Sequence, residues 1–218
     1  MTAPQVDALI DKLTAEAHPV RPLRAPSVRA LAMLSASAVA GLLAIILLGD
    51  MQQLLARYAG REALMWLEMA AMLATGMLAV TGAFFVSIPG RSKRWTLAPI
   101  LPLIAWLLLS GLGCYADLMG SGSSVSGIGH SLDCLVFILA VGLPLGALLI
   151  WRLSRAAPIE PLPVALLGGL GAAALAAFLL QFFHPFAVTF IDLAVHIAAI
   201  LLLVGAAALL NRRALSPA

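Results

Sequence analysis

Charged side chains are scarce in this sequence. Only 11% of the 218 residues are Asp, Glu, Lys or Arg, whereas 62% are hydrophobic and the mean hydropathy is +1.05. Soluble globular domains are roughly half apolar and about a quarter charged, so this composition excludes an ordinary soluble fold. The alternation of apolar and polar residues that is typical of a membrane β-barrel is also absent. The apolar runs are instead long and continuous, which predicts an integral membrane protein built from helices.

Cysteines and catalytic motifs are nearly absent as well. Two cysteines are too few for a disulfide framework. The chain has no CxxC or HExxH motif, and its soluble segments show no Walker motif, no Ser-His-Asp order and no paired catalytic carboxylates. These absences argue against an enzyme. The net charge of +3 does not indicate direct nucleic-acid binding, because the basic residues lie at the ends of the apolar segments.

Six apolar segments are long enough, at about 20 residues, to cross a hydrocarbon core as helices. We expect them at residues 30–49, 63–88, 96–116, 131–151, 162–183 and 187–210. Small residues recur along the fifth segment and form a face that permits close helix packing. The sequence thus predicts an all-α membrane protein with one bundle of six helices in residues 30–210. A cytoplasmic N-terminal segment, 1–29, would precede the bundle, and a tail, 211–218, would follow it.

Lys and Arg are distributed unequally between the two sides of the predicted membrane. Arg57 and Arg61 lie on one side, in the connection between the first two spans. The other eleven lie on the opposite side: Lys12, Arg21, Arg24, Arg29, Arg91, Lys93, Arg94, Arg152, Arg155, Arg212 and Arg213. Cytoplasmic segments carry the excess of positive charge, so both termini should be cytoplasmic. The loop between Cys114 and Cys134 would then face outward from a bacterial inner membrane.

The N-terminal segment contains one short amphipathic helix. Its apolar residues recur at the i, i+3, i+4, i+7 spacing of one helical face: Val6, Leu9, Ile10 and Leu13. Three prolines follow and end the helix before the first span: Pro19, Pro22 and Pro26. Such a face can lie on the membrane surface or bind a partner protein, and the pattern alone leaves both open.

Ionisable and thiol side chains inside the spans are costly, so each is a candidate functional residue. On the predicted topology they gather in the outer half. One set, which we expect to sense an external signal, comprises Glu68, Cys114, His130, Asp133 and Cys134. The two cysteines close and open the helices that flank the external loop. A disulfide between them requires Cα atoms within about 7 Å, and the alternative is two separate apolar fillers.

A second set offers metal ligands. Asp192 and His196 are four residues apart on one helical face, where a carboxylate can orient an imidazole. Together with His184 and Cys134 they supply the ligand types that zinc and similar divalent ions accept. The alternatives are a structural hydrogen-bonded group and a site for a cofactor such as haem. No spacing here selects one of the three.

Three stretches carry a resemblance to a known family. They are VDALIDKLTAEAHPVRPLRAP before the first span, Asp133-Cys134 through LPLGALLIWRLSRAAPIEPLPVALLGGLGAAALAAFLL, and the closing FFHPFAVTFIDLAVH. The chain resembles the NrsF family, also known as the DUF1109 proteins, which are six-span membrane anti-sigma factors of proteobacteria. The family typically carries one cysteine at the start of the fourth span and another at the end of the fifth. Cys134 matches the first position, His184 stands at the second, and Cys114 is additional.

The resemblance implies a binding and signalling protein. It would hold an extracytoplasmic-function sigma factor at the bilayer through the N-terminal apolar face and release it on an envelope, metal or redox signal. The alternative is a small transporter, or a redox or metal-binding membrane protein, that uses the outer residues directly. A transporter should carry ionisable or unwound positions in both halves of the membrane, whereas this chain carries them in one.

Overall fold

The computed structural model of the chain describes residues 3–16, 22–58, 63–120, 128–183 and 190–214. The described residues form helices and no strand: α1 (Ala3–Glu16), α2 (Pro26–Leu48), α3 (Met51–Tyr58), α4 (Ala63–Val86), the 3-10 helix η1 (Lys93–Thr96), α5 (Ile100–Gly120), α6 (Ile128–Ser154), α7 (Pro161–Leu180) and α8 (Phe190–Ala214). The predicted all-α fold is therefore confirmed.

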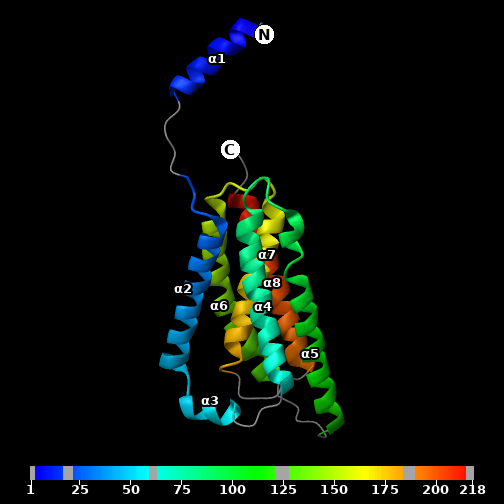
Figure 1. Cartoon of the computed structure of the whole chain (residues 1–218). Helices are drawn as coiled ribbons and strands as arrows, with labels where there is room; N and C mark the ends of the chain where they lie inside the picture. The colour runs from blue at the N-terminus through cyan, green and yellow to red at the C-terminus, as the bar shows by residue number, and fades with distance from the viewer. Residues whose placement is uncertain (1–2, 17–21, 59–62, 121–127, 184–189, 215–218) are drawn as a thin grey trace.

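Six of these helical stretches are long and apolar enough to cross a membrane. They are Pro26–Leu48, Ala63–Val86, Lys93–Leu112, Leu132–Ser154, Pro161–Leu180 and Leu193–Leu210, close to the six segments expected from the sequence. The helices run side by side, and α2 begins at the end of the bundle where α8 finishes (Figure 1). An even number of spans returns the chain to the end of the bundle at which it entered. Which compartment that end faces, and the division of the chain into 1–29, 30–210 and 211–218, stay predictions.

We call the end where α2 begins the basic end, because it carries Arg29, Arg91, Lys93, Arg94, Arg152 and Arg155. At this end Ala30 and Met33 of α2 pack with Phe84 of α4, Leu153 of α6 and Val164 of α7. At the opposite end, residues of α6, α7 and α8 form a second apolar cluster, while α4, α5 and α7 form a third.

Helix α7 lies at the centre of this packing. In its membrane span 61% of the residues are buried, against 6% for α2. Its small residues permit the approach, as the sequence predicts. A Cβ added to Gly171 would lie 2.7 Å from Cγ2 of Val80 on α4, and one added to Gly169 would lie 2.7 Å from Cα of Val204 on α8. No side chain larger than hydrogen fits at these two positions without moving a neighbouring helix.

Helix α3 lies in the connection between the first two spans, where the sequence analysis predicts no helix. Asp50 caps its start, where Oδ1 accepts a hydrogen bond from the amide of Gln52 at 2.9 Å. A helical pattern is nevertheless present in the sequence, because one helical face has the i, i+3, i+4, i+7 spacing at Met51, Leu54, Leu55 and Tyr58. Figure 1 shows α3 at the end opposite the basic end, directly after α2 and transverse to the direction of the spans.

The glycine packing of α7 predicts a stability difference between two matched substitutions. Gly169→Ala should destabilise the bundle by about 1–3 kcal/mol, because the new methyl meets the backbone of α8. Gly205→Ala, where nothing lies within 4 Å of the added Cβ, should be neutral or stabilise by up to about 1 kcal/mol. Thermal unfolding in one detergent compares the two variants. Equal midpoints would contradict close packing of α7 on α8.

Candidate functional site

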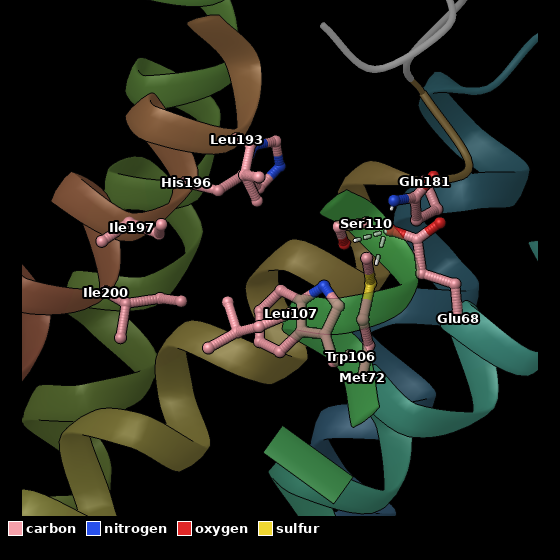
Figure 2. Close-up of a pocket in the computed structure, with 10 residues that line it drawn as sticks. All are labelled: Glu68, Met72, Trp106, Leu107, Ser110, Gln181, Leu193, His196, Ile197 and Ile200. Atoms are coloured by element: carbon pink, nitrogen blue, oxygen red, sulfur yellow. Dashed lines mark hydrogen bonds between the residues drawn. The ribbon is translucent and has the colours of Figure 1, made fainter. Parts of the chain in front are cut away.

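A small cavity lies between α4, α5 and α8, beside the residue that caps α7 and toward the end opposite the basic end. Its lining residues are Glu68, Met72, Trp106, Leu107, Ser110, Gln181, Leu193, His196, Ile197 and Ile200 (Figure 2). It leaves about 10 Å³ for the centre of a water molecule, which is room for about one water. Four of the lining side chains are polar, and each of the four comes from a different part of the chain.

Glu68 and Ser110 form the direct polar contact of this cavity. The hydroxyl of Ser110 donates to Oε1 of Glu68 at 2.5 Å, which joins α5 to α4. Ser110 is 4% exposed, so this bond lies inside the bundle. A carboxyl group at this depth needs such a donor, because neither lipid nor apolar side chains can provide one.

Gln181 and Tyr58 extend the polar contacts toward the surface of the bundle. The side-chain amide of Gln181 contacts Sδ of Met72 at 3.8 Å, and its backbone carbonyl accepts from the hydroxyl of Tyr58 at 3.3 Å. The Tyr58 ring also lies 5.2 Å from the ring of Trp66 and 6.0 Å from that of Phe182. Helix α3 is therefore attached to the end of α7, directly beside the cavity.

His196 lies across the cavity from Glu68, Ser110 and Gln181 (Figure 2). It is 7% exposed and is one of the few buried polar residues among those described. The structure thus brings Glu68 and His196, which the sequence placed in two separate sets, to one cavity. A carboxyl, an imidazole, a hydroxyl and an amide around space for one water can hold a proton, a water or a small polar ligand.

Cys134 does not line this cavity. It is 3% exposed and packs with Ile138, Leu180, Ala199 and Leu203, in the apolar cluster between α6, α7 and α8. Its neighbour Asp133 is exposed. The fourth span therefore begins with an exposed Asp133 and a buried Cys134. A role of either residue in sensing a signal stays a prediction.

The remaining predicted residues lie where the structure does not describe them. His184 is outside the described residues, as are the side chains of Cys114, His130 and Asp192. Within the described part of the chain, no three His, Cys, Asp or Glu residues lie close enough to hold a metal ion. The metal site of His184, Asp192, His196 and Cys134, like the disulfide between the two cysteines, therefore stays a prediction.

The sequence did not indicate Ser110 and Gln181 of the cavity, or Tyr58, which bonds Gln181 beside it. Ser110 is a lone hydroxyl in an apolar span, and such residues usually bond their own helix backbone, so it gave no distinct signal. Gln181 could have been noticed, because it is an uncharged polar side chain at the end of a span of almost pure Ala, Gly and Leu.

The N-terminal apolar face lies on α1, as predicted. Val6, Leu9, Ile10 and Leu13 are 40%, 44%, 51% and 58% exposed. Four apolar side chains thus share one face of a helix that also carries Asp7, Asp11, Lys12 and Glu16.

One protein-family model matches almost the whole chain. The NrsF family, described as negative regulator of sigma F, matches residues 13–216. No curated protein and no solved structure matches. The match covers all six membrane-length helices and begins at Leu13, so most of the apolar face of α1 precedes it.

The Ser110–Glu68 contact predicts a stability effect that an ordinary serine lacks. Ser110→Ala should destabilise the protein by about 1–3 kcal/mol, because the Glu68 carboxyl loses its donor inside the bundle. Ser37→Ala is the matched control. Ser37 bonds only the carbonyl of Met33 in its own helix, so its loss should cost less than about 0.5 kcal/mol. Equal thermal unfolding midpoints for the two variants would contradict the role of Ser110.

Proposed function

Because this chain belongs to the NrsF family of negative regulators of sigma F, we propose that it is a membrane-bound anti-sigma factor. It holds an extracytoplasmic-function sigma factor at the bacterial inner membrane and releases it when a signal reaches the bundle. The observation that carries the proposal is the family match across 13–216, which includes all six membrane-length helices. The family is one of regulators rather than enzymes.

The sigma factor binds the apolar face of α1. This face is the accessible apolar surface that the N-terminal segment offers to a soluble partner. Each of its side chains contributes about 1.5–3 kcal/mol when fully buried, so four of them suffice for a stable contact. The prolines between α1 and α2 are expected to end the first helix before the first span. The excess of Lys and Arg at the basic end supports a cytoplasmic position for α1.

The signal acts at the cavity around Glu68 and His196. A ligand or proton changes the bundle only if it binds two arrangements of the helices with different affinity, and a tenfold difference supplies about 1.4 kcal/mol. Residues of α4, α5 and α8, together with Gln181 at the C-cap of α7, line this cavity, so a change in it alters how these helices meet. A metal or thiol signal at Cys134, Asp133, His130, Cys114, His184 and Asp192 is the alternative input. A transporter is less well supported, because the ionisable residues occupy one half of the predicted membrane.

Paired charge substitutions on α1 test the sigma-binding face. Leu9→Asp with Leu13→Asp should release the sigma factor, because two carboxylates would enter an apolar contact. Ala8→Asp with Ala15→Asp adds the same charge on the opposite face of α1 and should leave sigma bound. Co-purification of sigma with the membrane fraction and a sigma-dependent reporter measure the outcome.

Sigma retention by the Leu9/Leu13 variant would contradict the assignment and indicate that α1 lies on the lipid surface. Equal release by both variants would show a general charge effect instead of a binding face.

Substitutions at the cavity test the signal input. Glu68→Gln and His196→Gln should each reduce the reporter response to envelope stress several-fold while sigma stays bound in unstressed cells. Glu160→Gln, which removes an exposed carboxylate at the basic end, is the control and should respond normally. Loss of the response in Cys134→Ser, with a normal response in both cavity variants, would move the input to the thiol.

A further inference from the structure

Helix α2 is attached to the bundle mainly at the basic end. Its buried residues are Pro26, Ala30 and Met33, all within the first two turns. Beyond them no residue of α2 is fully buried, and Leu47 and Leu48 near its other end are 76% and 77% exposed. Because α2 continues from the N-terminal segment, whatever fixes its first turns also fixes the base of that segment.

Arg29 makes the polar contact that joins these first turns to α6. Its Nη2 donates to the backbone carbonyl of Arg152 at 2.7 Å, and its guanidinium lies over the ring of Phe84, 5.0 Å from the centroid. The neighbouring carbonyls at the end of α6, those of Trp151, Leu153 and Ser154, accept from Ser154 Oγ and from the amides of Ala156 and Ala157. The local bonds leave the carbonyl of Arg152, and Arg29 caps it. A positive charge at the C-terminal end of α6 also interacts favourably with the helix dipole.

The contact between the start of α2 and the end of α6 carries positive charge that the contacts of Arg29 do not neutralise. Burial takes the guanidinium of Arg29 partly out of water, and the positive charge of Arg152 acts on it unfavourably as well. Nη1 of Arg29 is buried and has no hydrogen-bond partner. Apart from the residues of α1, the one acidic residue of the sequence at this end is Glu160, and its carboxylate pairs with Lys93. Among the described residues, no carboxylate forms an ion pair with Arg29 or Arg152 at the boundary of the apolar spans.

We propose that the phosphate of an anionic phospholipid binds between Arg29 and Arg152. Guanidinium groups match phosphate oxygens through paired N–H donors, and basic sites between membrane helices bind anionic headgroups. The position fits a lipid headgroup, because Arg29 lies where the span of α2 begins and Arg152 lies where the span of α6 ends. Trp151, 51% exposed with Arg152 and Arg155 over its ring, lies at the same level, as interfacial tryptophans do.

The bound phosphate would hold the start of α2 to the end of α6 and relieve the repulsion between the two arginines. A zwitterionic lipid brings its own positive group to the same place, so the site should prefer an anionic headgroup. This inference depends on the six membrane spans and not on the identity of a protein partner.

Two matched arginine substitutions test the site. Arg152→Gln removes one guanidinium but keeps the backbone carbonyl that Arg29 caps, so the variant should fold. Arg155→Gln removes the same charge from a side chain over the same Trp151 ring. Native mass spectrometry of purified protein with phosphatidylglycerol or phosphatidylcholine measures binding, and thermal unfolding without lipid checks the fold.

The wild-type protein should bind phosphatidylglycerol on the order of tenfold more tightly than phosphatidylcholine, as a charge-assisted contact predicts. Arg152→Gln should lose most of this preference, while Arg155→Gln should keep it. Equal binding of the two lipids by the wild-type protein would overturn the proposal, and so would an equal loss in the two variants.

Two further arms separate other sources of negative charge. Displacement of phosphatidylglycerol by millimolar inorganic phosphate would identify a free-anion site and overturn the lipid assignment. If Arg152→Gln weakened sigma binding in phosphatidylcholine alone and left the lipid preference intact, the two arginines would instead bind acidic side chains of the protein partner.

Discussion

Close contact between α7 and its neighbours determines the arrangement of the other helices. Val80 of α4 and Val204 of α8 reach the backbone of α7 because glycines face them. In lipid, apolar side chains gain little from leaving the hydrocarbon, so close van der Waals packing and hydrogen bonds must drive helix association. A helix of Gly and Ala supplies the packing. It also has almost no polar groups of its own, and the polar contacts of the bundle therefore form around its two ends.

The two ends of the bundle meet this requirement differently. At the end opposite the basic end, Gln181 follows the last turn of α7, and Glu68, Ser110 and His196 gather beside it in a cavity with room for one water. At the basic end, Arg29 crosses from α2 to cap α6 over the ring of Phe84. Rigid apolar helices connect these places. A change in packing at one end therefore has a physical route to the other through the movement of whole helices.

The position of α2 relates this bundle to the proposed control of a sigma factor. The helix that precedes the bundle, α1, exposes an apolar face, and α2 follows it with buried residues in its first turns only. Few contacts thus need to change for the base of the N-terminal segment to shift. A loosely attached first span is suited to a regulator that must hold a partner and then release it, because a small difference in free energy decides between the two states.

The sequence by itself determined the class of the protein, the number of spans and the small-residue face of α7, because each depends on local composition and helical periodicity. It also determined the apolar face of α1, which is a property of one helix. Only the tertiary structure decided which polar residues meet. Glu68 and His196 lie 128 positions apart, and Cys134, which looked equally suited to join them, packs among apolar side chains of α6, α7 and α8. The rotation of each helix about its own axis makes this choice, and that rotation follows from side-chain packing between helices distant in the chain, which no local pattern records.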